Sequence, residues 1–149
     1  MTSRLTLSIH MLGLIAWNET CRCGPATSEQ MAQSINTNPV VVRRLLGDLR
    51  RAGLVETKRG VGGGVRLLRP PERITLRDVY EAVAEDEQLL ALHPNPPDAC
   101  CVIGGHIDRY LRGVYDEAEE ALKQRLASVS IRDVYEALVA CRPRPVTRG

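Results

Sequence analysis

The stretch NPVVVRRLLGDLRRAGLVETKRGVGGGVRL, residues 38–67, decides the fold of this 149-residue chain. It opens with Asn38-Pro39, an N-cap side chain followed by proline at the first helical position, where the missing N–H removes no hydrogen bond. Apolar residues then recur on one face, arginines occupy other positions, and Gly53 is placed to end the helix. The spacing therefore predicts an amphipathic, arginine-bearing helix over residues 38–52.

A short β-hairpin is expected after this helix, with strands at residues 54–57 and 65–68. Between them lies Lys58-Arg59-Gly60-Val61-Gly62-Gly63-Gly64, in which four of the last five residues are glycine. Glycine permits positive φ and carries no side chain, so this basic loop can enter a narrow space. We interpret the hairpin as the wing of a winged helix, and Arg69-Pro70-Pro71 is expected to stop the sheet.

Two further helices are predicted before residue 38. The first has a thick apolar face and is expected to stop near Asn18, and the second is short and capped by Thr27 or Ser28. A polar turn at residues 36–38 then gives the spacing of a helix-turn-helix, whose last helix enters the major groove of DNA. The residues predicted to contact DNA are Ser28, Asn36, Thr37, Asn38, Val40, Val41, Arg43, Arg44, Arg50, Lys58, Arg59, Gly60, Gly62 and Gly63.

The charge distribution favours a duplex nucleic acid as the partner of the N-terminal half. Residues 1–74 hold 11 arginines and lysines and 5 acids, a net charge of +6, whereas residues 75–149 hold 9 and 13, a net charge of −4. A basic half suits a polyanion. Phenylalanine is absent, and one tryptophan with four tyrosines leaves little aromatic surface to stack unpaired bases. Double-stranded DNA is therefore the expected partner.

Composition is that of a single globular domain, with 44% hydrophobic and 26% charged residues. No apolar run approaches the roughly 20 residues that span a bilayer, and the first residues lack a small-residue cleavage site. We expect a cytoplasmic protein with no membrane partner.

The C-terminal half contains an internal repeat and a long apolar stripe. Residues 75–83 recur closely as residues 130–138, each copy opening with a hydroxyl residue and an acid three positions later, which predicts two helices with capping boxes. The rigid, proline-rich loop 93–97 precedes a helix too apolar to be covered by so small a domain, so a second subunit is expected to cover it. The predicted dimerisation residues are Ile103, Ile107, Tyr110, Leu111, Val114, Ala118 and Leu122.

These features predict a mainly α fold with a small β-hairpin, a winged helix-turn-helix plus a long C-terminal dimerisation helix. The expected divisions are a DNA-binding domain at 1–85, a sensor loop at 86–102, dimerisation and C-terminal helices at 103–141 and a tail at 142–149.

Residues 54–67, residues 70–76 and the long helix after Gly104 resemble the Rrf2 family of bacterial winged-helix regulators. The resemblance covers nearly the whole chain. It implies a homodimeric transcriptional regulator, commonly a repressor, with its recognition helix in the major groove and its wing in the minor groove. On that pattern Arg59 is the wing residue expected to enter the minor groove, where a narrow A·T-rich stretch attracts guanidinium.

The five cysteines are too few and too scattered for a secreted disulfide framework. Iron-sulfur members of the family place three spaced cysteines in the loop before the long helix, whereas this chain has only Cys100-Cys101 there. No cofactor is therefore predicted, and a cluster that also uses Cys21 or Cys23 is the alternative. We favour thiol sensing, because Cys100 and Cys101 precede an expected helix start, where a thiol pKa falls. Oxidation could join them to Cys21, Cys23 or a partner's cysteine, and the Cys-x-Cys pair could also bind a soft metal.

The sequence thus predicts a DNA-binding regulator that responds to an oxidant or small ligand. A winged-helix module that binds only proteins is the alternative from another class, although it would not need the uncompensated positive charge. No catalytic residues are predicted, because no His, Cys and acid have the spacing of a nucleophile with its base, and the glycines lack the Gly-Lys-Ser/Thr of a phosphate loop.

Overall fold

The computed structural model describes residues 3–84 and 88–141 of the chain. The described part is mainly helical and contains one two-stranded antiparallel hairpin, as predicted. In chain order the elements are α1 (Arg4–Cys21), α2 (Ser28–Ile35), α3 (Pro39–Arg51), β1 (Val55–Lys58), β2 (Gly64–Leu67), the 3-10 turn η1 (Pro71–Arg73), α4 (Leu76–Val83), α5 (Ile107–Ala127) and α6 (Ile131–Ala140). The predicted tail at 142–149 lies outside the described residues.

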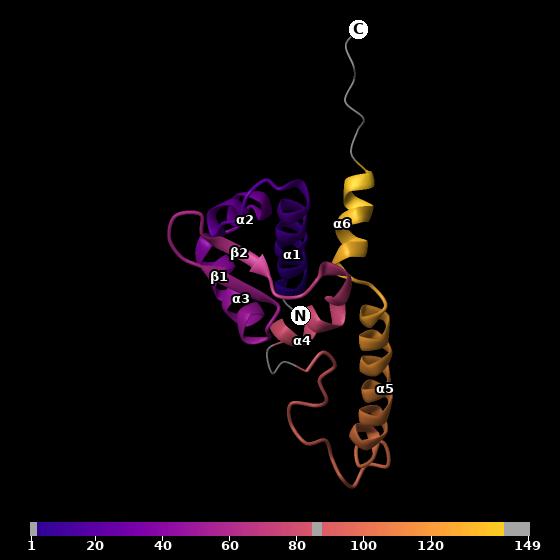
Figure 1. Ribbon diagram of the computed structural model, residues 1–149. Coiled ribbons are helices and arrows are strands. Elements are labelled where there is room, and N and C mark those ends of the chain that lie inside the picture. The colour runs from indigo at the N-terminus through magenta and orange to yellow at the C-terminus, as the bar shows by residue number, and fades with distance from the viewer. Residues whose placement is uncertain (1–2, 85–87, 142–149) are drawn as a thin grey trace.

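The helices α1 to α4 and the hairpin form one body, which we call the head (Figure 1). Its core draws apolar side chains from each of these helices and from both strands. The largest fully buried ones are Met11, Leu12, Ile15, Met31, Leu45, Leu49, Leu54, Ile74, Ile131, Val42, Val55 and Val79. Ile131 comes from the first turn of α6, so that helix is anchored in the same core.

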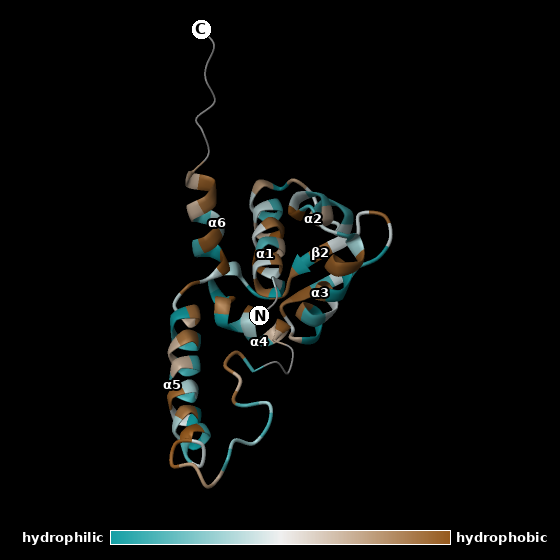
Figure 2. Ribbon diagram, turned by 180° about the vertical axis from the view of Figure 1, so that it is seen from behind, coloured by the Kyte–Doolittle hydropathy of each residue, from teal (hydrophilic) through white to brown (hydrophobic). Residues whose placement is uncertain are grey.

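The helix α5 is the exception to this packing. It runs for 21 residues and none of them is buried. Figures 1 and 2 show α5 and α6 on one side of the head, with α5 extending away from it and carrying apolar patches along its length. Two of its apolar side chains, Tyr110 and Val114, are 74% and 44% exposed. The predicted apolar stripe is therefore only partly covered in a single protomer.

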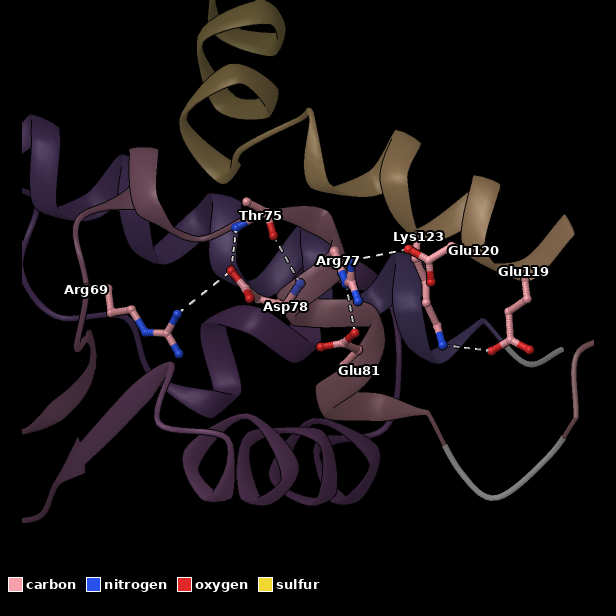
Figure 3. A network of polar contacts seen from close by, with 8 residues as sticks. All are labelled: Arg69, Thr75, Arg77, Asp78, Glu81, Glu119, Glu120 and Lys123. Carbon is pink, nitrogen blue, oxygen red and sulfur yellow. Dashed lines mark hydrogen bonds and ion pairs between the residues drawn. The ribbon is translucent and has the colours of Figure 1, made fainter. Parts of the chain in front are cut away.

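Polar contacts join α5 to α4 at the edge of the head (Figure 3). The Arg77 guanidinium lies 2.8 Å from the Glu81 carboxylate on its own helix and 3.9 Å from Glu120 on α5. All three side chains are largely in contact with solvent, so these ion pairs orient the helices and contribute little to stability.

The two copies of the sequence repeat meet at their N-termini. Thr75 caps α4 and Ser130 caps α6, and each forms a complete capping box with the aspartate three residues later, as predicted. The backbone around these caps pairs in an antiparallel bridge, with Leu76 N–H donating to Val129 O (2.9 Å) and Ile131 N–H to Ile74 O (2.8 Å). The repeat therefore supplies two matching caps that pair with each other, a contact that neither copy could form alone.

Several predicted boundaries are wrong by a few residues. The helix α1 continues past Asn18 to Cys21, because the Asn18 carbonyl accepts a hydrogen bond from the turn that ends the helix, from Cys23 N–H at 3.0 Å. The hairpin strands are each shifted by one residue from the predicted ranges.

The long helix α5 begins at Ile107, so Ile103, expected on this helix, lies in the turn that precedes it. Backbone bonds within that turn, including Gly105 N–H to Cys101 O at 2.8 Å, explain the delay. Within the described ranges, none of the helices has the length and apolar character needed to cross a membrane.

Candidate nucleic-acid interface

The helix-turn-helix is built by side-chain caps at each break in the chain. Thr27 begins α2 with a capping box in which its hydroxyl accepts from Gln30 N–H, so Thr27 rather than Ser28 is the cap. Asn36 ends α2 in the left-handed conformation, at φ 59°, which asparagine adopts more readily than most residues. Asn38 then begins α3, accepting the Val40 N–H at 2.9 Å, with Pro39 next. These local choices fix the turn that presents α3.

The helix α3 buries one face and exposes another. Val42, Leu45, Leu46 and Leu49 lie in the core of the head. The opposite face carries the predicted contact residues. Val40, for example, is 63% exposed. The exposed side chains on this face are Asn38, Val40, Val41, Arg43, Arg44 and Arg50. An exposed helix face that combines valine, asparagine and arginine offers both methyl contacts and hydrogen-bond donors to base edges.

An arginine-lined hollow of about 630 Å³ lies beside α3. Its basic side chains are Arg4, Arg43, Arg44 and Arg51, and its one carboxylate is Asp48. Asp48 pairs with Arg4 at 2.5 Å and also with Arg51, and so ties the start of α1 to α3. Four guanidinium groups around a single acid give the hollow an excess of positive charge, which suits a phosphate group.

The contact residues predicted from the sequence include Arg50 near the end of the helix but not Arg51 or Arg4, which line this hollow. Arg43, Gly47 and Arg51 recur at intervals of four, which places them on one helical face, and that spacing was a usable signal. Arg4 could not be found in this way, because its place beside Asp48 depends on the packing of α1 against the rest of the head.

The wing, residues 58–64, closes the hairpin whose last pair is Lys58 and Gly64. Gly60 and Gly62 have positive φ values of 94° and 74°, so a side chain at either position would strain the backbone. At Gly63 an added Cβ would collide with the Lys58 carbonyl oxygen. Lys58, Arg59 and Val61 are all exposed at the tip. The predicted glycine-dependent basic loop is therefore present, and each of these glycines has a structural reason.

The helix α3 and the wing lie on the side of the head away from α5 and α6 (Figure 1). Residues 38–66, which include α3 and the wing, hold seven arginines and lysines and two acids, a net charge of +5. Glu29 on α2 lies 3.8 Å from Arg43, but both side chains are mostly exposed, so this pair can exchange for contact with another anion. Ser28, also predicted to contact DNA, is at the start of α2 and donates its hydroxyl to Glu29 at 3.2 Å.

The cysteines fall into two groups. Cys21 and Cys23 form a disulfide with each other, whereas Cys100, Cys101 and Cys141 are free and exposed. The pKa of the Cys101 thiol is lowered by hydrogen bonds from the backbone of Gly104 and Ile103. The expected cause was a helix N-terminus, but α5 starts six residues later, so the local turn supplies the donors. A Cβ at Gly104 would lie 2.6 Å from Asp98 O, so glycine is needed to close this turn.

The donor set of one protomer does not fit an iron-sulfur cluster. In residues 3–84 and 88–141, no group of three or more His, Cys, Asp or Glu side chains is placed to hold a metal ion. Cys100 and Cys101 are adjacent, and the other two candidate cysteines are bonded to each other at the far end of α1. A cluster would need ligands from outside this arrangement.

An arginine-bearing second helix of a helix-turn-helix, followed by a basic hairpin, defines the winged helix-turn-helix class of proteins. Comparison with known proteins identifies the family within this class. Residues 1–137 match the model of the Rrf2 family, described as an iron-dependent transcriptional regulator, and the chain belongs to this family.

Relatives support this assignment over nearly the full length. YwnA of Bacillus subtilis (strain 168), assigned to the helix-turn-helix type of transcriptional regulators, is 38% identical over 138 residues, covering 93% of this chain and 98% of YwnA. Two solved structures share the fold. IscR of T. potens superposes with a TM-score of 0.71 at 18% identity, over 97% of this chain and 92% of that one. CymR of B. subtilis, the global cysteine regulator, gives 0.65 at 22% identity, over 92% and 96%.

Proposed function

We propose that this transcriptional regulator acts in the cytoplasm as a homodimer that binds a two-fold symmetric DNA operator, with α3 of each protomer in the major groove. The observation that carries the proposal is the excess of exposed arginine and lysine on α3 and the wing, which lie on the side of the head away from α5. Membership of the Rrf2 family and the helix-turn-helix relatives support DNA as the partner.

Each predicted contact has a distinct role in this proposal. Asn38, Val40 and Val41, at the start of α3, face the base edges, where valine methyls can contact thymine. The Asn38 oxygen caps α3, so its Nδ2 amide group donates to a base-edge acceptor. Arg43, Arg44, Arg50 and Lys58 contact phosphates, as do Ser28 and Thr37 near the turn. The backbone of Gly60, Gly62 and Gly63 lets the wing approach closely, and Arg59 enters the minor groove.

The exposed stripe on α5 supports the dimer. A 21-residue helix is about 32 Å long, and isolated helices gain most of their stability from packing an apolar face. Within the described protomer, Tyr110 and Val114 on this face are exposed and its other apolar residues are at most half-buried. A second copy is the simplest additional cover. Of the residues assigned to dimerisation, Ile107, Tyr110, Leu111, Val114, Ala118 and Leu122 lie on the helix, and Ile103 lies in the turn before it. Repression is the proposed direction, because a bound dimer would cover promoter DNA.

The signal is proposed to act on the turn that holds Cys100 and Cys101, ahead of α5. Asp98 organises this turn, its carboxylate accepting from Cys100 N–H at 2.9 Å. The lowered pKa of Cys101 increases its thiolate fraction near neutral pH, which favours reaction with an oxidant. Because the turn leads directly into α5, its modification could alter the dimer.

Replacement of Arg59 tests the DNA-binding proposal. A duplex selected by the protein from a random-sequence pool is labelled with fluorescein, and binding is measured by anisotropy at physiological salt. Arg59→Ala should weaken binding about tenfold, about 1.4 kcal/mol, with the greatest loss at A·T-rich flanks. Arg112→Ala, an arginine on α5, is the matched control and should bind as the parent does. Equal affinity of Arg59→Ala and Arg112→Ala would remove the wing from the interface, and failure to select any duplex would reject the function.

A further inference from the structure

The Cys21–Cys23 disulfide lies where α1 ends and the chain turns toward α2. Only Arg22 separates the two cysteines, whose Cα atoms are 5.3 Å apart. A bridge across so few residues closes a minimal loop and so removes little entropy from the unfolded chain. It is also accessible, because Cys23 is exposed and Cys21 is half-buried. General stabilisation therefore does not account for this bridge.

The bridge spans a backbone conformation that arginine rarely adopts. Arg22 lies in the left-handed region at φ 54° and ψ 36°. The turn is otherwise supported by Cys23 N–H, which donates to Asn18 O at 3.0 Å. Because a residue with a Cβ is disfavoured in this region, a covalent link between its two neighbours helps to hold the reversal in place. Without the disulfide, Arg22 is less constrained and can move from the left-handed region to a negative φ.

The two sides of this reversal form hydrogen bonds with β2, the second strand of the hairpin. Before it, the Glu19 carboxylate accepts Leu67 N–H at 3.0 Å. After it, the Ala26 carbonyl accepts Val65 N–H at 2.8 Å. The loop after α1 also packs closely against the start of β2, since a Cβ on Gly64 would lie 2.6 Å from Pro25 Cβ. The Cys21–Cys23 disulfide lies between Glu19 and Ala26 in the chain. The distance between these two residues therefore influences the position of β2 and of the wing that β2 continues.

We propose that Cys21 and Cys23 are a reversible redox site whose disulfide holds the wing in its DNA-binding position. The proposal rests on the proposed DNA-binding function. For a protein that acts on DNA inside a cell, a disulfide is expected to be transient and regulatory. The co-reactants are low-molecular-weight thiols and their disulfides, which need only the exposed edge of the pair.

The exchange takes place in two steps. A small thiolate attacks the exposed Cys23 sulfur, breaking the Cys21–Cys23 bond and releasing the Cys21 thiolate, which takes up a proton. A second small thiolate attacks the outer sulfur of the mixed disulfide, releasing the Cys23 thiolate, which is also protonated, and one small disulfide. Two electrons pass from the two small thiols to the cysteine pair, and oxidation is the reverse of these steps.

The test uses the full chain with Cys100→Ser, Cys101→Ser and Cys141→Ser, so that Cys21 and Cys23 are the only thiols. Glutathione buffers of graded poise set the redox state, and alkylation with mass spectrometry counts free thiols. The duplex selected by the protein in non-reducing buffer is used for anisotropy. We expect operator affinity to fall at least fivefold as the pair is reduced. A cysteine-free protein, made by adding Cys21→Ser and Cys23→Ser to this background, should bind with the reduced-state affinity at every poise.

Hydrogen exchange at Val65 and Leu67 separates this inference from the proposed function. On reduction, both amides should exchange faster, whereas amides in the middle of α3 should be unchanged. If DNA binds equally well in both verified redox states, the inference is overturned and the function stands. If no DNA binds in either state, the proposed function is overturned. If hydrogen exchange at Val65 and Leu67 is unchanged on reduction, the link between the disulfide and the wing is overturned. A pair that never forms a disulfide at any poise overturns the redox site itself.

Discussion

The head and α5 use apolar residues in opposite ways. In the head, side chains such as Met11, Leu45 and Leu49 are fully buried among four helices and a hairpin. In α5, apolar side chains lie along a helix with no buried residue. Burial of apolar surface is the main favourable term in folding, so the head has its own source of stability and α5 does not. The order of α5 in solution should therefore depend on a second copy.

The largest effect is expected from a cavity in the head. Leu49→Ala removes a side chain that is 0% exposed and should cost about 2–5 kcal/mol of unfolding free energy, a large part of the stability of a small domain. Leu68→Ala makes the same chemical change at a side chain that is 50% exposed and should cost well under half as much. Urea denaturation followed by circular dichroism measures both. Equal costs would contradict the assignment of the stabilising core to the head.

A charge on the α5 stripe should affect association and leave the head intact. Val114→Asp places a carboxylate in the proposed dimer interface, where an unpaired charge is costly to bury. We expect at least a tenfold weaker dimer, about 1.4 kcal/mol or more, by sedimentation equilibrium. Changes in the unfolding free energy of the head should stay within about 0.5 kcal/mol.

The matched control for this charge is Arg112→Asp, two residues away and about 200° around the helix. It should associate like the parent chain. A parent protein that is monomeric at micromolar concentration would remove the dimer from the proposal, whereas equal weakening by both variants would show that charge, and not the apolar stripe, sets association.

The same contrast explains what could be predicted from the sequence. Features governed by residues close in the sequence were predicted. They include the Asn38 cap with Pro39, the glycines of the wing, and the separate capping boxes at Thr75 and Ser130. Each of these features depends on hydrogen bonds or φ values of residues a few positions apart in the chain, so the residue types alone indicate it.

Contacts between distant segments were not predictable in this way. The bond from Leu67 N–H to Glu19, the burial of Ile131 in the core of the head and the bridge between the two caps all join residues far apart in the chain. The start of α5 was missed for a related reason, because Gly104 and Gly105 fold back on Asp98 and Ala99 rather than continuing the helical pattern. Residue types near α3 indicated a DNA-binding surface, but the place of Arg4 in the arginine-lined hollow required the packed head.

The smallest effect is expected at the cap where α6 joins the head. Hydrogen bonds from the Ser130 backbone and hydroxyl, with a further contribution from Arg132, lower the pKa of Asp133. A carboxyl whose pKa is lower in the folded state stabilises the fold above the unfolded value, near 3.9, and this stabilisation is lost as pH falls through the folded value.

Loss of an N-cap hydroxyl typically costs about 1 kcal/mol, and Ser130→Ala should destabilise the fold by about this much at pH 7. The part of this cost that depends on the Asp133 carboxylate should shrink as pH falls and Asp133 is protonated. Thermal unfolding at pH 7 and at pH 3 measures this difference. Thr75→Ala removes the matching hydroxyl from the box within the head and is the control for cap loss at pH 7. If the cost of Ser130→Ala were the same at both pH values, the cap would act without the Asp133 carboxylate, and the junction between the head and α6 would not be sensitive to acid.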